Sequence, residues 1–222
     1  MAHSILKYKA EPYDDLNYCV GKGIMYQRDM SRSVNYDAAY FDKYLSYEDT
    51  DIAKLLNKFR IGLVEKYSRQ DILDVGIGSG EFIKKSVRKV YGFDINLKAV
   101  EWLNERNLYI NPYLGIPQNI DCLTFWDSLE HIREPWNILN KVRNEMYVMV
   151  SMPIFDDLFN LRSSKHYRPD EHYYYFTSVG FIAYMNECGF DLLEVSDYET
   201  QAGRESITTF VFSRRSYLKV IL

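Results

Sequence analysis

The chain has 222 residues, of which 47% are hydrophobic and 26% charged, and its formal net charge is −4. This length accommodates one α/β domain with an added segment and is short for two independent cores. The negative balance argues against a broad phosphate-neutralising surface, so a nucleic-acid partner is disfavoured. No apolar run approaches the roughly 20 residues that span a bilayer, and the N-terminus lacks a secretory apolar core. We therefore expect a cytoplasmic protein with no membrane partner.

The three cysteines, Cys19, Cys122 and Cys188, lie far apart and form no CxxC pair. This spacing indicates reduced thiols rather than a disulfide framework. Cys19 precedes a turn with two glycines, but one thiol cannot supply the four ligands of a zinc site. We expect no metal.

Residues 1–50 form a polar leader rich in tyrosine, which we treat as an extension of a main domain over residues 51–222. Within the leader, "YCVGKGIMYQ" predicts a hairpin that turns at Gly21-Lys22-Gly23. Three tyrosines recur every four residues and would share one face of a helix, namely Tyr36, Tyr40 and Tyr44. That stripe is either a packing surface or a lid over a pocket.

Beyond the leader, helix and strand patterns alternate. Apolar residues from Asp51 to Tyr67 recur at spacings of three and four and predict an amphipathic helix. The expected strands, in chain order, are "DILDV", "VYGFDI", "LYINPYL", "IDCLTFW", "MYVMVSM", "FDLLEVSDY" and "SITTFVFSR". Further helices are expected over 81–88, 97–106, 135–143, and from a cap at Thr177 to just before Gly189. This alternation predicts a mostly parallel sheet with helices on both faces, whose last two strands can pair as an antiparallel hairpin.

The segment "ILDVGIGSGEF", residues 72–82, sets three glycines at alternate positions between a strand and a helix. Without Cβ atoms, these glycines let a ligand press against the main chain at the carboxyl end of the sheet. A GxGxG pattern alone is weak, because many adenosine-binding proteins share it. Asp74 precedes the first glycine by two residues, where dinucleotide-binding strands carry an apolar residue. Asp94 ends the next strand, where its carboxylate can accept hydrogen bonds from both hydroxyls of an adenosine ribose.

Together, "ILDVGIGSGEF", "VYGFDIN" and "CLTFWDSLEHI" resemble, in order and spacing, the motifs of class I S-adenosylmethionine-dependent methyltransferases. The resemblance covers roughly residues 71–212 and is to the small domains of this class that modify small molecules. It implies an α/β, Rossmann-like sheet of seven strands with the last strand antiparallel, here with an N-terminal helical extension. "DSLEHI" has no counterpart after the fourth strand of dehydrogenases, which speaks against a nucleotide-dependent oxidoreductase.

The resemblance implies S-adenosyl-L-methionine as the cofactor and S-adenosyl-L-homocysteine as the product. The methionine part would lie along the glycines, the ribose at Asp94, and the methyl end near Asp127 and Ser128. The implied cofactor-binding residues are Asp74, Gly76, Gly78, Gly80, Phe93, Asp94, Ile95, Asp127 and Ser128. The stretch "NPYLGIPQNID" lacks the acidic residue that often meets the adenine amino group, which leaves Leu114 or a nearby main-chain group for that contact.

Methyl transfer from a sulfonium chiefly requires the nucleophile, the methyl carbon and the sulfur to be held in line, so no fixed catalytic residue is needed. A general base helps when the acceptor is a hydroxyl or a protonated amine. The long connection after the fifth strand, residues 152–177, carries basic and aromatic side chains. It is either an ordinary surface loop or a wall for an anionic or planar acceptor, with His166 or His172 as the base. Glu130 and His131 are expected to brace the loop after the fourth strand.

Two motifs that are missing from the sequence restrict the class of methyl acceptor. No Asn/Asp-Pro-Pro-aromatic tetrapeptide follows the fourth strand, and no Pro-Cys pair exists, which disfavours base-modifying chemistry of those types. We expect transfer to an oxygen or nitrogen of a small-molecule acceptor. The alternatives are a non-catalytic protein that binds S-adenosylmethionine or another adenosine ligand, and a methyltransferase acting on nucleic acid or protein. The sequence leaves the oligomeric state open.

Overall fold

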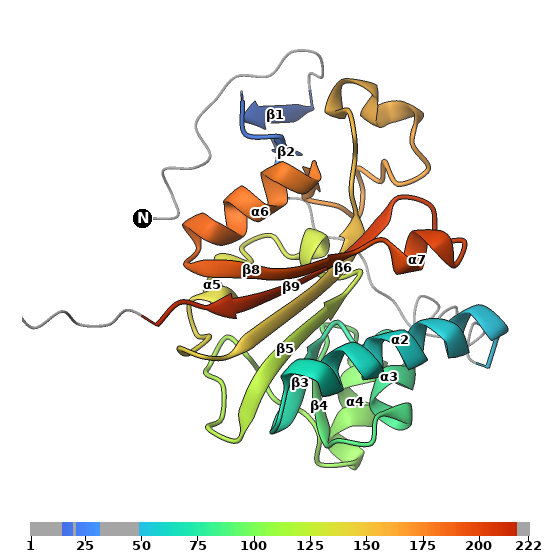
Figure 1. The fold of residues 1–222 in the computed structure, drawn as a ribbon, viewed down its shortest axis with the longest axis vertical. Coiled ribbons are helices and arrows are strands. Elements are labelled where there is room, and N and C mark those ends of the chain that lie inside the picture. Colours follow the sequence, from blue (N-terminus) through green and yellow to red (C-terminus); the bar gives the residue numbers. More distant parts are fainter. Residues whose placement is uncertain (1–14, 20, 32–48, 217–222) are drawn as a thin grey trace, which may run out of the picture.

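A computed structural model describes residues 15–19, 21–31 and 49–216. Its main element is a six-stranded sheet with the strand order β4-β3-β5-β6-β9-β8 (Figure 1). These strands are β3 (Asp71–Val75), β4 (Val90–Phe93), β5 (Ile120–Trp126), β6 (Tyr147–Pro153), β8 (Phe190–Ser196) and β9 (Ile207–Arg214). The helices are α2 (Asp51–Tyr67), α3 (Glu81–Lys85), α4 (Leu97–Glu105), α5 (Trp136–Leu139), α6 (Ser178–Glu187) and α7 (Tyr198–Gln201), with the short 3-10 helices η2 (Leu129–His131) and η3 (Leu158–Ser163).

Strand directions confirm the expected class of fold. Strands β4, β3, β5 and β6 pair in parallel, whereas β9 is antiparallel to both of its neighbours, β6 and β8. The last strand is therefore the antiparallel one. The carboxyl ends of the parallel strands lie together at one edge of the sheet, which is where open α/β folds bind ligands.

The expected count of seven strands in this sheet is wrong by one. The stretch "LYINPYL" contributes only an isolated parallel bridge, between Tyr109 and Gly92. Pro112 has no N–H to donate to a ladder, and the chain turns there, with the N–H of Leu114 donating to the carbonyl of Asn111. A strand cannot continue through that turn.

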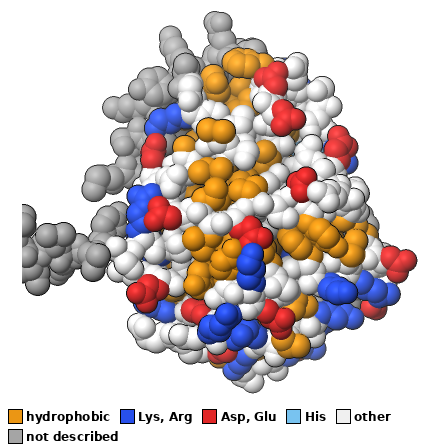
Figure 2. Space-filling model, in the orientation of Figure 1, with side chains coloured by type: hydrophobic (Ala, Val, Ile, Leu, Met, Phe, Trp, Pro, Cys, Tyr) orange, Lys and Arg blue, Asp and Glu red, His pale blue; other side chains and the backbone are white. Residues whose placement is uncertain are grey.

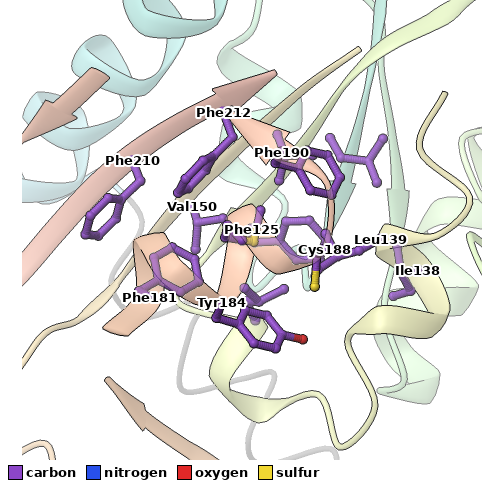
Figure 3. Close-up of a cluster of buried hydrophobic side chains, with 14 of the residues drawn as sticks. Phe125, Ile138, Leu139, Val150, Phe181, Tyr184, Cys188, Phe190, Phe210 and Phe212 are labelled. Atoms are coloured by element: carbon purple, nitrogen blue, oxygen red, sulfur yellow. The ribbon is translucent and has the colours of Figure 1, made fainter. Parts of the chain in front are cut away.

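Helices cover both faces of the sheet, as predicted (Figure 1). One apolar cluster joins α2, α3 and α4 to one face, through residues such as Val64 and Leu103. A second cluster joins α5 and α6 to the other face. Figure 3 shows its centre, where Phe181 of α6 lies against Phe210 and Phe212 of β9, at ring-centroid distances of 5.0 and 5.6 Å. Burial of such rings is a main source of fold stability.

A separate three-stranded sheet has the order β1-β2-β7, from β1 (Leu16–Cys19), β2 (Ile24–Gln27) and β7 (Tyr174–Phe176). The predicted hairpin is thus confirmed, with Gly21 and Gly23 at φ +73° and +64° in its turn. The part of the leader expected to form a helix, with Tyr36, Tyr40 and Tyr44, lies outside the described residues.

The predicted cap at Thr177 is confirmed, and Gly189 after α6 is left-handed, at φ +89°. The side chains of Thr50 and Asn96 cap α2 and α4. Helices α3 and α5 end after one turn, earlier than their apolar patterns suggested. None of the helices in the described ranges combines the length and apolar character needed to cross a bilayer.

Candidate active site

The loop between β3 and α3 exposes main chain where the sequence predicted it. Gly76, Gly78 and Gly80 have φ angles of +83°, +56° and +74°, a region that residues with a Cβ rarely adopt. A Cβ on Gly76 would lie only 2.5 Å from the Cβ of Ser128. The N–H of Gly76 donates to the carbonyl of Phe93 at 2.8 Å, which fixes the loop beside the end of β4.

Asp94, directly after β4, connects the glycine loop to α4. One of its carboxylate oxygens accepts a 3.0 Å hydrogen bond from the N–H of Ile77, and the other a 2.8 Å bond from the N–H of Asn96. Burial raises the pKa of this carboxyl, and these N–H groups oppose the rise. Backbone hydrogen bonds from Ile95 and Gly78 also act on this carboxyl, so a ribose hydroxyl would share the acceptor oxygens with the main chain.

Asp74 is a buried carboxyl in the middle of the sheet. It lies in β3 and accepts a 2.7 Å hydrogen bond from the hydroxyl of Thr124 on β5. Burial raises the pKa of Asp74 to about 7, although Thr124 and Arg60 act to lower it. The carboxyl is therefore poised between its neutral and ionised forms near neutral pH, and a ligand cation would favour the ionised form.

Asp127, directly after β5, has a left-handed backbone, at φ +56°, and its N–H donates to the carbonyl of Ser151 on β6. Arg204 holds both of its carboxylate oxygens, at 2.8 and 2.9 Å, and Arg60 reaches one of them at 3.3 Å. Burial acts to raise the pKa of Asp127, but the two guanidinium groups hold it below its usual value. This aspartate is therefore ionised and already paired.

A second carboxylate completes this charged network. Glu199 of α7 is completely buried and accepts two 2.9 Å hydrogen bonds from Arg60, and further bonds from Arg204 and the hydroxyl of Ser151. The guanidinium of Arg60 also lies 5.0 Å from the centre of the Trp126 ring. Two cations and two anions thus balance one another and join α2 and α7 to the carboxyl ends of β5 and β6.

The remaining residues predicted to bind the cofactor differ in how accessible their side chains are to a ligand. The hydroxyl of Ser128 donates to the carbonyl of Val75, which places this side chain against the glycine loop. Phe93 is buried beside Tyr109 and Tyr113, so its ring is largely occupied by packing. Ile95 is 62% exposed directly after Asp94 and is accessible to a bound base. Leu114, at 85%, is exposed as well.

The connection after β6 folds over the carboxyl ends as a tethered segment. The hydroxyl of Tyr167 donates to Asp15, next to β1, at 2.8 Å. The basic side chains of this connection form three ion pairs: Arg162 with Asp15, Lys165 with Glu205, and Arg168 with Glu171. The predicted cationic wall is therefore largely neutralised by neighbouring acids.

The two histidines predicted as bases lie in different environments. The Nε2 atom of His166 is 2.7 Å from the carbonyl oxygen of Glu205, and half-burial lowers the pKa of this imidazole. His172 is buried, and its ring meets that of His131 edge to face at 4.5 Å. Burial lowers the pKa of His172 to about 2. A base this weak is poorly matched to proton abstraction near neutral pH, which favours His166 over His172 for that role.

His172 instead belongs to a cluster with Glu130 and His131 of η2. Potential ligand atoms of the three side chains all lie within 4.8 Å of one another. Glu130 is 3% exposed, and neither of its carboxylate oxygens has a hydrogen-bond partner among the described residues. Burial and the nearby Asp127 raise the pKa of Glu130 well above its usual value, while burial lowers the pKa of His131 to about 4.

Sequence reasoning missed Arg60, Arg204, Glu199 and Thr124. The three charged residues belong to segments far from the motifs, and their spacing signals no shared site. Thr124 did carry a signal, because it is a polar residue inside the apolar run "IDCLTFW", on the same face of the sheet as Asp74. A hydroxyl in that position needs a buried partner.

A parallel sheet with one antiparallel final strand, a glycine loop and an acid after the second strand define a Rossmann-like nucleoside-binding fold. A family model described as a methyltransferase domain matches residues 44–195. The chain therefore belongs to this methyltransferase family, and it is an S-adenosylmethionine-dependent methyltransferase of class I.

Solved structures share this fold. Magnesium protoporphyrin IX methyltransferase from Synechocystis PCC 6803, with bound SAH, is 13% identical over 81% of this chain and 96% of its own, with a TM-score of 0.57. A methyltransferase from Clostridium acetobutylicum ATCC 824 is 13% identical over 80% and 98%, with a TM-score of 0.54. The [4+2]-cyclase SpnF is 14% identical over 72% and 81%, with a TM-score of 0.51. At these identities the likeness shows the fold alone. No curated protein matches the chain in sequence.

Proposed function

We propose that this enzyme transfers the methyl group of S-adenosylmethionine to an oxygen or nitrogen atom of a small molecule. The observation that carries the donor half is the carboxylate of Asp94. It is hydrogen-bonded to the glycine loop through Ile77 and lies directly after β4, where its oxygens can also accept a hydrogen bond from a sugar hydroxyl. The same side chain that would bind the ribose therefore also shapes the loop on which the methionine part would lie.

The methionine end would meet Asp74 and the main chain of the glycine loop. A ligand ammonium can donate to Asp74, whose pKa near 7 lets it ionise at little cost when that cation arrives. Asp127 faces Arg204 and Arg60 instead of standing free, so its proposed role is indirect. It would fix the turn after β5, and with it Ser128, against the methionine part of the cofactor.

The acceptor would approach from the side formed by η2 and the connection after β6. Methyl transfer gains most from holding the acceptor atom, the methyl carbon and the sulfur in line. His166 is the proposed proton acceptor, because its imidazole is neutral at physiological pH and only half-buried. Its bond to the carbonyl of Glu205 fixes the ring.

Surface charge supports a small acceptor rather than a nucleic acid. On the face shown in Figure 2, lysine and arginine side chains are scattered among aspartate and glutamate, with hydrophobic side chains between them. This pattern lacks the continuous basic stripe expected of a phosphate-binding surface. The Synechocystis neighbour, named for a small-molecule acceptor, sets a precedent for such chemistry on this fold.

The competing proposal is a protein that binds the nucleoside without methyl transfer. The presence of a [4+2]-cyclase among the structural neighbours is the specific observation behind it, because this fold also supports a non-methylating activity. Calorimetry with S-adenosylhomocysteine, followed by transfer of labelled methyl from S-adenosylmethionine into a size-fractionated cell extract, separates the two. Label in the low-molecular-mass fraction supports our proposal. Binding without label in any fraction favours the competitor, and label confined to RNA or protein rejects a small acceptor.

A further inference from the structure

The structure assigns a divalent-cation site to Glu130, His131 and His172, beside the proposed acceptor side of the active site. The three potential ligand atoms lie within 4.8 Å of one another, close enough for one ion to contact all three. The Oε1 atom of Glu130 and the Nε2 atom of His131 are 3.9 Å apart, too far for a hydrogen bond and suitable for two ligands of a shared ion.

Glu130 is the observation that points to a ligand. The residue is 3% exposed, and neither carboxylate oxygen has a hydrogen-bond partner among the described residues. A buried, unpaired carboxylate is costly, and buried charges are normally paired or bound to metal. Protonation would not satisfy the group, because the acid O–H would then lack an acceptor. A cation held between Glu130 and the two imidazoles would pair the Glu130 carboxylate.

The fold holds these side chains together through the backbone. The N–H of Tyr173 donates a 2.8 Å hydrogen bond to the carbonyl of Glu130, which sets His172 beside η2. The side chain of Gln27, buried in the leader hairpin, donates to the carbonyl of His172 at 3.1 Å. The His131 ring hydrogen-bonds the backbone of Glu171, the kind of contact that usually orients a metal-binding imidazole.

The donor set limits the kind of metal. One carboxylate and two neutral imidazoles suit borderline divalent ions such as Zn²⁺ or Co²⁺ better than Mg²⁺ or Ca²⁺, which prefer oxygen ligands. Three protein ligands leave at least one coordination position open, as in catalytic rather than structural sites. Asp127 lies close enough to raise the pKa of Glu130, but two guanidinium groups already occupy it.

The role of the ion rests on the proposed function. An acceptor hydroxyl bound at the open position would lose its proton more readily, here to the imidazole of His166. The resulting oxygen anion forms a bond to the methyl carbon while the carbon–sulfur bond breaks and its electron pair returns to sulfur. The products are the methyl ether and S-adenosylhomocysteine. The site thus favours an oxygen acceptor over a nitrogen one.

The first test measures metal binding by tag-free, full-length protein. After chelation and dialysis, Zn²⁺ is titrated by calorimetry and bound metal is counted by elemental analysis. We expect one ion per chain in the wild type, and at least tenfold weaker binding in Glu130→Gln and His172→Gln. The sequence holds four histidines. A variant that combines His3→Gln with His166→Gln keeps both proposed histidine ligands, His131 and His172, and should bind metal as the wild type does. Unchanged binding in Glu130→Gln, or loss in this control, overturns the assignment.

A second measurement does not depend on variants that fold. Co²⁺ bound to imidazole and carboxylate in a distorted site gives visible absorption bands, so wild-type protein titrated with Co²⁺ should develop them to saturation at one equivalent. A colourless titration rejects the site. Calorimetry with S-adenosylhomocysteine on the same samples keeps the two proposals apart. Wild-type protein that binds the nucleoside but no metal rejects the cation site, and wild-type protein that binds metal but no nucleoside rejects the proposed function.

Discussion

The hydroxyl of Thr124 on β5 donates a 2.7 Å hydrogen bond to the carboxyl of Asp74 on the adjacent strand β3. Burial raises the pKa of Asp74 to about 7, with the charges of Arg60 and Asp94 acting in opposite directions. If the ionised carboxylate binds the cofactor ammonium, protonation below pH 7 competes with binding. We expect the affinity for S-adenosylhomocysteine to fall up to about tenfold per pH unit below pH 7 and to level off above it. Calorimetry between pH 5.5 and 8 measures this.

Two variants test whether the pH dependence of nucleoside binding comes from the carboxyl of Asp74. Asp74→Asn cannot titrate, so its affinity should be weaker and nearly independent of pH. Thr124→Val removes a bond that favours the ionised form, so the midpoint should move to higher pH. A wild-type affinity that stays level down to pH 5.5 would contradict the role of Asp74 as an ammonium acceptor.

Replacement of Asp94 tests the ribose assignment. Asp94→Ala removes two charge-assisted hydrogen bonds to the sugar and should weaken nucleoside binding by about 1–3 kcal/mol, roughly 5- to 150-fold. The exposed Asp191→Ala serves as the control, since within the described ranges the Asp191 carboxylate pairs with Arg215, at a distant position in the sheet. Circular dichroism checks that both variants fold. A folded Asp94→Ala protein with wild-type affinity would remove the ribose assignment.

Gly76 is predicted to tolerate no side chain. Its φ of +83° alone costs an alanine about 1–2 kcal/mol, and the Cβ would also meet Ser128 at 2.5 Å. Crowding of this kind adds about 1–3 kcal/mol. Gly21→Ala is a matched control, because Gly21 has a similar φ of +73° and open space around its Cβ position. Urea unfolding should show Gly76→Ala to be the more destabilised of the two. Equal losses would mean that Ser128 does not restrict the loop.

The order of elements was predictable because their signals are local. Apolar spacing located α2 at Asp51–Tyr67, and the capping side chain of Thr177 marked where α6 begins. The third strand was not predictable from its apolar residues, because the turn at Pro112 outweighs their preference for a strand. A local proline turn, which the spacing of apolar residues does not register, kept this segment out of the sheet.

The site was predictable only where its residues lie close together in the sequence and form a short motif. A hydrogen bond joins Ile77 of the glycine loop to Asp94, 17 positions later, and both residues lie in motifs that are recognisable in the sequence. Arg60 and Glu199 are 139 positions apart, and Gln27 reaches His172 across 145. Such contacts depend on the packing of whole elements, so neither the charged network nor the histidine cluster has a short sequence signature.

The charged network around Asp127 should contribute strongly to stability. Arg204→Met leaves Asp127 with only the 3.3 Å contact to Arg60, and Glu199 remains buried with one guanidinium instead of two. Removing one partner of a buried ion pair typically costs 3–5 kcal/mol. Because Arg204 and Asp127 are about a quarter exposed, we expect about 2–4 kcal/mol in urea unfolding at pH 7. The control Lys22→Met breaks an exposed pair with Glu187 and should cost less than about 1 kcal/mol.

The same network should make stability sensitive to acid. The pKa of Asp127 is held below its usual value, so its contribution is complete above about pH 4 and is lost as the pH falls through the lowered pKa. Of the two guanidinium groups, Arg204 lowers the pKa of Asp127 more than Arg60 does, and Arg204→Met removes it. The stability difference between wild type and Arg204→Met should therefore shrink between pH 5 and pH 2. A difference that stays constant over this range would mean that Arg204 stabilises the fold by packing rather than by its charge.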